Sequence, residues 1–335
     1  MLRKVTVAAA ALLVSSSLAI SPATAQDVKP AVVFDMGGKF DKSFNEGVYN
    51  GVERFKKETG IEYREFEVTN ETQREQALRR MAQRGADPVI GVGFAQEPAM
   101  TKVAQEFPNT RFAIIDAVVD LPNVRSIVFK EHEGSFLVGM IAALKSQTGK
   151  VGFVGGMDIP LIRKFACGYE QGAKHVSGDT EVVQNMTGTT PAAWNDPTRG
   201  AELAKSQFDR GVDVIYAAAG GTGVGVYQTA EDSDKLAIGV DSNQNYLHPG
   251  TMLTSMLKRV DVAAYKAFKD AEEGNWSSGI QVLGLAEDGV GWALDEYNKD
   301  LITEEMKTRV AEAAKDIVAG KLKVHDYTAD NSCTY

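Results

Sequence analysis

Short apolar runs alternate with longer amphipathic stretches from Pro30 to about Gly320. This alternation is typical of βα units, in which buried strands build a largely parallel sheet and helices cover its faces. The pattern predicts strands at 31–34, 63–68, 88–92, 112–115, 126–129, 151–154, 181–183, 212–216, 236–240, 251–257 and 280–285. Helices are expected between them, with later ones at 132–146, 260–273 and 303–319. The predicted fold class is therefore α/β.

The helix after the first strand of each half carries the same motif. Phe-x-x-Gly-x-x-x-Gly begins at Phe44 and again at Phe165, and Ser43 is a plausible N-cap for the first of these helices. Glycines four residues apart leave a flat helix face that can approach a sheet closely. Coincidence between two short glycine patterns is the alternative. Together with the repeated βα order, the repeated motif predicts two similarly built, Rossmann-like lobes.

The boundary between the lobes is expected at the Thr148-Gly149-Lys150 break. After Asp241 the alternation changes, and two later runs can cross back between the lobes. We therefore assign 26–147 plus about 255–283 to the N-terminal lobe, and 148–254 plus about 284–335 to the C-terminal lobe. A hinge made of several segments supports closure around a ligand.

The first 25 residues have the pattern of a secretory signal peptide. Arg3 and Lys4 precede an apolar run of about ten residues, and Ala23-Thr24-Ala25 offers small residues before a cut. The run is too short for a bilayer span of roughly 20 residues, which argues against the alternative of a retained anchor. No cysteine follows it, so lipid attachment is not expected. We expect export to the periplasm.

Cys167 and Cys333 are the two cysteines of the chain. In an oxidising compartment such a pair can persist as a disulfide, which here would hold the C-terminal tail on the second lobe. Two unrelated buried thiols are the other interpretation, because sequence does not show proximity. A catalytic cysteine is not expected, since no histidine is evidently paired with either.

Composition removes several classes of protein. A chain of 335 residues exceeds the roughly 250–300 at which single cores stop growing. With 44% hydrophobic and 24% charged residues, it is neither disordered nor fibrous. Its formal net charge of −9 argues against a non-specific nucleic-acid binder or a binder of anionic membranes.

Familiar enzyme motifs are missing from the sequence. It contains no G-x-S-x-G elbow, no H-E-x-x-H and no G-x-x-x-x-G-K-[ST] phosphate loop, and its four histidines lack metal-ligand spacing. Gly221-x-Gly223-x-Gly225 lacks the full dinucleotide spacing and better fits a backbone contact to a ligand. We expect no enzyme, no metal and no cofactor.

Polar side chains instead follow the predicted strands. Asp35, Asp116 and Asp241 each come directly after a strand, and Lys258 ends another. Each aspartate alone could cap a helix or a turn. Open α/β sheets bind ligands outside the carboxyl ends of their strands, so the group together indicates one cleft.

Five motifs, in order along the chain, resemble the basic membrane protein family. They are Asp35-Met-Gly-Gly-Lys-Phe-Asp-Lys-Ser-Phe-Asn45, Gly155-Gly-Met-Asp-Ile-Pro160 with Phe165-x-x-Gly168, Trp194-Asn-Asp-Pro197, Ala219-Gly-Gly-Thr-Gly-x-Gly225 and Gly239-Val-Asp241. The members are substrate-binding proteins of ABC importers, related to purine nucleoside receptors. The resemblance implies a type I periplasmic-binding fold and a purine nucleoside, such as adenosine, guanosine or inosine, or a free purine, held between the lobes.

The same resemblance implies roles for matching residues. Phe44 would stack on the purine, Asn45 and Asp116 would bond base edges, and Asp241 and Lys258 would hold ribose hydroxyls. Trp194 is the candidate for a second stacking ring, with a packed loop tryptophan as its alternative. The ligand-binding residues expected are Asp35, Phe44, Asn45, Asp116, Trp194, Gly221, Asp241 and Lys258.

The partners implied are the ligand and an ABC permease in the inner membrane, for a monomeric binding protein. Three other functions stay open: a binder of the same fold for a sugar or signal molecule, an exported nucleoside hydrolase, and a sensor that presents the closed lobes to a membrane receptor. Family members commonly carry a lipid-anchor cysteine, and its absence here leaves the mode of attachment open.

Overall fold

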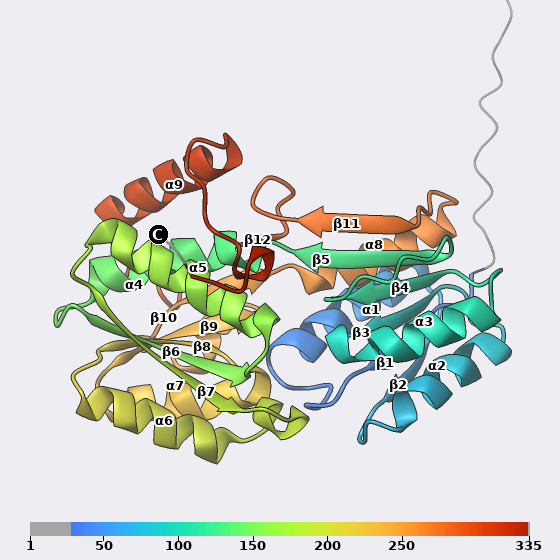
Figure 1. Ribbon diagram of the computed structural model, residues 1–335, viewed down its shortest axis with the longest axis horizontal. Coiled ribbons are helices and arrows are strands. Elements are labelled where there is room, and N and C mark those ends of the chain that lie inside the picture. Colours follow the sequence, from blue (N-terminus) through green and yellow to red (C-terminus); the bar gives the residue numbers. More distant parts are fainter. Residues whose placement is uncertain (1–27, 334–335) are drawn as a thin grey trace, which may run out of the picture.

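The computed structural model describes residues 28–333, and it has two α/β lobes side by side (Figure 1). The sheet of the first lobe has the order β11 (Gly279–Leu283), β5 (Val124–Phe129), β4 (Phe112–Ile115), β3 (Val89–Val92), β1 (Ala31–Phe34) and β2 (Arg64–Glu67). The sheet of the second has the order β12 (Val290–Trp292), β10 (Met252–Lys258), β9 (Leu236–Asp241), β8 (Val214–Ala218), β6 (Lys150–Met157) and β7 (Glu181–Gly188). The strand pairs are parallel apart from β10 and β12. The α/β class and the two-lobe arrangement predicted from the sequence are confirmed.

Helices cover both faces of each sheet. The first lobe contains α1 (Phe44–Thr59), α2 (Gln73–Gln83), α3 (Glu97–Glu106) and α8 (Val260–Glu272). The second contains α4 (Glu131–Lys145), α5 (Pro160–Val176), α6 (Pro197–Asp209), α7 (Gly223–Asp232) and α9 (Glu304–Val318). Short 3-10 helices are η1 (Phe94–Gln96), η2 (Pro191–Trp194), η3 (Gly220–Thr222), η4 (Asn245–Leu247) and η5 (Tyr327–Ala329).

Strand β1 shows why its sequence forms a buried strand. All four of its residues are apolar and fully buried, and successive side chains point to opposite faces. Val32 and Phe34 join the cluster that contains α1 and α8, whereas Ala31 and Val33 join the one that contains α2 and α3. A strand that is covered on both faces has no polar position, which accounts for its continuous apolar run.

The chain crosses between the two sheets three times within the described residues. It leaves β5 for α4 at Lys130, leaves β10 for α8 at Arg259, and passes from β11 to β12 through 284–289. Two of the predicted boundaries between the lobes therefore differ from those in the structure. The helix at 132–146 was expected in the first lobe, but α4 packs on α5, β10 and β12, and all of β10 belongs to the second sheet. Periodicity predicts the strands and helices, but it does not say which sheet a strand joins.

The repeated glycines allow helices, rather than a helix and a sheet, to approach closely. A Cβ atom at Gly172 of α5 would lie 1.9 Å from the carbonyl oxygen of Phe136 in α4. One at Gly51 of α1 would lie 2.1 Å from the carbonyl oxygen of Asp261 in α8. The motif therefore marks a close contact between two helices in both lobes. The prediction that these glycines face a sheet was wrong.

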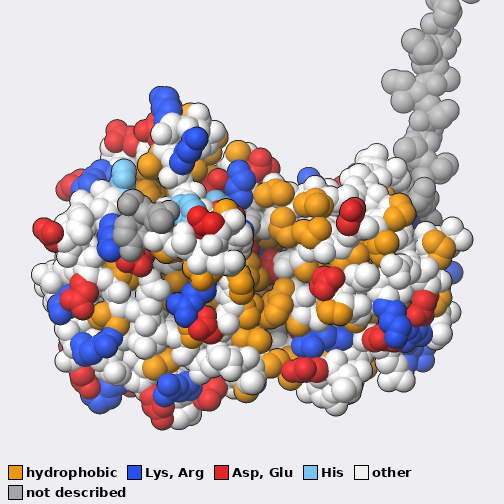
Figure 2. Space-filling view, in the orientation of Figure 1, with side chains coloured by type: hydrophobic (Ala, Val, Ile, Leu, Met, Phe, Trp, Pro, Cys, Tyr) orange, Lys and Arg blue, Asp and Glu red, His pale blue; other side chains and the backbone are white. Residues whose placement is uncertain are grey.

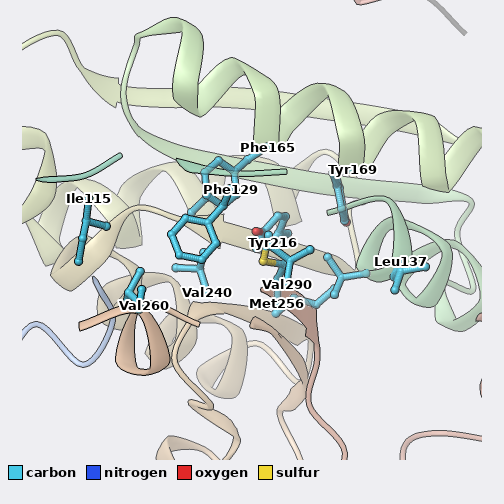
Figure 3. Packing of buried hydrophobic residues seen from close by; sticks show 14 of the residues in the cluster. Ile115, Phe129, Leu137, Phe165, Tyr169, Tyr216, Val240, Met256, Val260 and Val290 are labelled. Atoms are coloured by element: carbon cyan, nitrogen blue, oxygen red, sulfur yellow. The ribbon is translucent and has the colours of Figure 1, made fainter. Parts of the chain in front are cut away.

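The apolar core is continuous from one lobe to the other. Ile115 and Phe129 of the first lobe share a buried cluster with Phe165, Tyr216 and residues of the crossing segments (Figure 3). Figure 3 places Phe129 and Phe165 next to each other, one from each lobe. The lobes therefore meet over packed side chains at the hinge.

Cys167 and Cys333 form a disulfide, with their Cα atoms 5.5 Å apart. The bond joins α5 to the C-terminal tail and decides between the two interpretations of the cysteine pair. The expected signal peptide, 1–25, lies outside the described residues. Within 28–333, no helix combines the length and the apolar character that a membrane crossing requires.

Candidate ligand-binding site

A cavity lies between the lobes, at the carboxyl ends of strands from both sheets. In Figure 2 the lobes meet along a groove in which hydrophobic side chains gather. The first lobe lines the cavity with Asp35, Met36, Asp41, Phe44, Asn45, Gly93, Phe94 and Asp116. The second lines it with Leu161, Ile162, Phe165, Trp194, Ala218, Gly220, Val240, Asp241 and Lys258. Topology therefore brings together the strand ends that the sequence singled out.

Seven of the eight expected residues line this cavity. The exception is Gly221, which does not line the cavity, whereas its neighbour Gly220 does. A Cβ atom at Gly221 would lie 3.4 Å from the backbone oxygen of Trp194. The loop of the glycine motif therefore reaches the cavity through Gly220, and a ligand contact at Gly221 stays a prediction.

The aromatic side chains of the site come from both lobes. Phe44 is the first residue of α1, and Trp194 is the last residue of η2. The indole fits against Gly156, where a Cβ atom would lie 2.1 Å from the Trp194 ring carbon Cζ3. The glycine of the Gly155-Gly156 motif thus makes room for the tryptophan, and the two rings form apolar walls of the cavity.

Asp116 and Asp241 lie at the carboxyl ends of equivalent strands, Asp116 directly after β4 and Asp241 as the last residue of β9. Both have left-handed backbones, with φ of 72° and 62°, which aspartate tolerates better than most residues do. Burial raises the pKa of each carboxyl to about 6, and the Lys258 ammonium opposes that rise.

Lys258 is the buried cation of the site, with a side chain only 1% exposed. Its Nζ lies 2.7 Å from Oδ2 of Asp116 and 2.9 Å from Oε1 of Glu131. Although burial lowers the pKa of Lys258, the carboxylates of Asp116, Glu131 and Asp241 outweigh it and hold the pKa above its usual value. The ammonium also lies 5.3 Å from the ring centroid of Phe44. Lys258 and Phe44 are therefore within the range of a cation–π contact.

Asp41 is a site residue that the expected set omitted. Its carboxylate accepts hydrogen bonds from the backbone N–H groups of Ser43, Asn45 and Glu46, and burial raises its pKa to about 6. It therefore caps α1, which corrects the expectation that the Ser43 side chain does so. The Asp-x-x-x-Asn spacing at the start of this helix could have revealed the capping role of Asp41.

Asn45 is fixed in the wall of the cavity. Its Nδ2 donates to Oδ2 of Asp41 at 3.1 Å, and its side chain is buried. Its Oδ1 has no hydrogen-bond partner among the described residues, and the same holds for Oδ1 of Asp116. Two buried acceptors at one cavity are an arrangement that a ligand with N–H donors would complete.

Hydrogen bonds join the lobes beside the site. The Ser43 hydroxyl, from the first lobe, donates to Oδ2 of Asp241 in the second. The Ser242 hydroxyl donates to the carbonyl of Ser43 at 2.9 Å, and Nε2 of Gln244 donates to the carbonyl of Lys42 at 3.0 Å. The start of α1 is thereby attached to the loop after β9.

Asp35 is held differently from the other acids. Its Oδ1 lies 2.9 Å from Nε of Arg74, and burial raises its pKa even though the arginine opposes the rise. The apolar lining residues Met36, Phe94 and Leu161 were not expected, because Met36 follows β1 and the other two lie at the starts of η1 and α5, where no periodic pattern marks them. Phe165 appeared only as the counterpart of Phe44 in the glycine motif.

Comparison with known proteins supports the same family. The model of the Bmp family, described as ABC transporter substrate-binding protein PnrA-like, matches residues 28–326. An uncharacterized lipoprotein of Pyrococcus abyssi is 36% identical over 91% of this chain and 76% of its own length. The ABC transporter nucleoside-binding protein BmpA of Lactococcus lactis is 32% identical over 89% of each chain.

A solved structure shares the fold. The ABC transporter solute-binding protein of Aeropyrum pernix K1 superimposes with a TM-score of 0.82 at 31% identity, covering 88% of this chain and 92% of that one. The two lobes with three crossings have the type I periplasmic-binding architecture that the resemblance implied. The chain belongs to the Bmp family of PnrA-like substrate-binding proteins of ABC transporters.

Proposed function

We propose that this substrate-binding protein captures a purine nucleoside, or a free purine base, between its lobes and delivers it to a membrane permease. The observation that carries the proposal is the meeting of Phe44, Asn45, Asp116, Asp241 and Lys258 in one cavity. A flat heterocycle needs an aromatic face, and its N–H edges need acceptors. A pentose needs groups that bond vicinal hydroxyls.

Each part of a nucleoside has a counterpart in the site. Stacking of a base on an aromatic ring contributes about 1–3 kcal/mol, which Phe44 supplies, with Trp194 as the candidate second ring. Oδ1 of Asn45 and Oδ1 of Asp116 accept from the base edge, which relieves the cost of buried acceptors without partners, about 1–3 kcal/mol each. Asp241 and Lys258 hold the ribose hydroxyls.

Charge favours a nucleoside over a nucleotide. Four aspartates, Asp35, Asp41, Asp116 and Asp241, line the same cavity as Lys258, which is already paired with carboxylates. A phosphate group would add negative charge beside these carboxyl groups, so the site discriminates against phosphorylated ligands.

Closure of the lobes is the mechanism of capture. Phe44, Asn45 and Asp116 come from the first lobe, whereas Trp194 and Asp241 come from the second. A ligand that contacts both lobes stabilises the closed state by its differential affinity, and the three crossings act as the hinge. The chemistry requires no covalent step, so the protein carries its ligand unchanged.

The place of action follows from the family and the N-terminal sequence. We infer that the segment 1–25 directs export and that the mature protein works in the periplasm. Relatives such as the one from Pyrococcus abyssi are named lipoproteins, but the first cysteine of this chain is Cys167, which is bonded to Cys333.

The test is to identify what the purified protein carries and binds. Small molecules released by denaturing the protein are identified by mass spectrometry, and isothermal titration calorimetry measures binding of adenosine, guanosine, inosine and hypoxanthine. We expect one of these at a one-to-one ratio. A sugar or an amino acid at that ratio would overturn the proposal, and release of free base and ribose during incubation would indicate a hydrolase.

A further inference from the structure

The ammonium of Lys258 is held by a carboxylate that lies outside the ligand cavity. Glu131 is 1% exposed, and its Oε1 lies 2.9 Å from Nζ of Lys258. Its Oε2 lies 3.0 Å from Nζ of Lys164, which in turn donates to the carbonyl of Phe129 at 2.8 Å and lies 3.5 Å from Asp326. The chain of charges therefore runs from the ligand site through Glu131 to the C-terminal tail.

Glu131 occupies a special place in the fold. It is the first residue of α4, directly after the crossing at Lys130, while Lys258 ends β10, directly before the crossing at Arg259. Their ion pair thus joins two of the three segments that pass between the lobes. Glu131 lines a neighbouring hollow, together with Lys164 and Asp326. That hollow shares Asp116 with the ligand cavity, which Glu131 itself does not line.

We propose that Glu131 is a positioning residue of the ligand site, which fixes the ammonium of Lys258 and, through it, the carboxylate of Asp116 in the geometry that the ligand meets. This inference rests on the proposed function, in which Asp116 and Lys258 contact the ligand. Because Glu131 moves with the crossing segment at Lys130, the site is correctly assembled only at the lobe angle that keeps this pair intact.

The surroundings of Lys258 explain why a second carboxylate is needed. A lysine side chain has four rotatable bonds and loses much rotamer freedom on being fixed. Phe129 and Phe165 place ring centroids 5.1 and 5.4 Å from Nζ, and these ring faces attract a cation without setting its direction. The ion pairs with Asp116 and Glu131 set that direction, because each is a short, charge-assisted contact.

Glu131 also shapes the electrostatics of Asp116. The charged groups acting on Asp116 are Lys258, Glu131 and Asp241. Lys258 favours ionisation of Asp116, whereas Glu131 and Asp241 oppose it. Removing the charge of Glu131 therefore lowers the pKa of Asp116, whereas removing a carboxylate that does not act on Asp116 leaves that pKa unchanged.

The experiment compares Glu131→Gln and Glu131→Asp with a matched control, Glu133→Gln. Glu133 lies two residues further along the same helix and is also buried. It pairs with Lys130 and accepts a hydrogen bond from the backbone N–H of Leu285, instead of pairing with Lys258. Calorimetry with adenosine, guanosine and inosine between pH 5 and 9 gives the affinity. A carbon-13 NMR titration of Asp116, assigned with Asp116→Asn, gives its pKa in the ligand-free protein.

We expect Glu131→Gln to weaken binding about tenfold at pH 8, which lies above the pKa of about 6 of Asp116 and Asp241. In the same variant the pKa of Asp116 falls by roughly one unit, and the acid limb of the affinity profile moves to lower pH. Glu131→Asp keeps the charge and restores most of the pH profile. Glu133→Gln leaves both the affinity and the pKa of Asp116 unchanged.

Two results would overturn the inference: an unchanged pKa of Asp116 in folded Glu131→Gln, or the same loss of affinity in Glu133→Gln as in Glu131→Gln. If wild-type protein binds none of the three nucleosides, the proposed function fails, and the NMR titration still decides the electrostatic link from Glu131 to Asp116. Circular dichroism confirms that each variant is folded before either measurement.

Discussion

The hydroxyl of Ser43 connects the two lobes at the ligand site, and its removal should weaken ligand binding. Ser43 is fully buried and donates to the Asp241 carboxylate across the interface between the lobes. In Ser43→Ala the lobes lose this bond only when they are closed, because the donor and the acceptor belong to different lobes. Each lobe keeps its own packing.

The size of the effect follows from the kind of bond. A hydrogen bond to a charged group contributes about 1.5–3 kcal/mol. Since about 1.4 kcal/mol corresponds to a factor of ten, Ser43→Ala should raise the dissociation constant by roughly 10- to 100-fold. Calorimetry with the nucleoside that wild-type protein binds measures this, and small-angle X-ray scattering reports whether the lobes still close at saturation.

The matched control is Thr254→Val. Thr254 is equally buried, and its hydroxyl donates to the carbonyl of Ala293 at 2.7 Å, within the second lobe. This control should lower the melting temperature and leave the affinity within about twofold of wild type. If Ser43→Ala binds as tightly as wild type, the bond across the interface contributes nothing to closure, and the reasoning is refuted.

Three further predictions test the site and the fold. Phe44→Ala should weaken nucleoside binding by about 10- to 100-fold through lost stacking, whereas a sugar ligand would be affected less; calorimetry with both ligands distinguishes these outcomes. Nucleoside affinity should fall as the pH drops through about 6, since Asp116 and Asp241 must be ionised to accept from the ligand; affinity that is constant from pH 8 to pH 5 would contradict this. Replacing Cys167 and Cys333 with serine should lower the free energy of unfolding by about 2–5 kcal/mol in denaturant titrations, and an unchanged free energy of unfolding would contradict this.

The strand ends of the site were predictable from the sequence because topology determines where they meet. Asp116 and Asp241 follow continuous apolar runs, and parallel strands bring their carboxyl ends to one edge. The pattern of nearby residues was enough to predict that these two aspartates lie at the cavity. The same holds for Phe44, the first residue of the helix that follows the first strand.

The remaining features depend on contacts that are distant in sequence. Glu131 and Lys258 are 127 positions apart by their numbers and carry no shared motif, so their ion pair emerges only from the fold. The disulfide closes a separation of 166 residues and likewise has no local signal. The predicted lobe of α4 was wrong for the same reason, because the composition of an apolar helix does not show which of the two sheets it covers.

The three crossings also bear on how the molecule is made. The edge strands β11 and β12, at Gly279–Leu283 and Val290–Trp292, complete the two sheets near the C-terminal end of the chain. Each sheet therefore lacks one of its edge strands until the segment 279–292 is present, so both lobes are completed by the same late stretch of the chain.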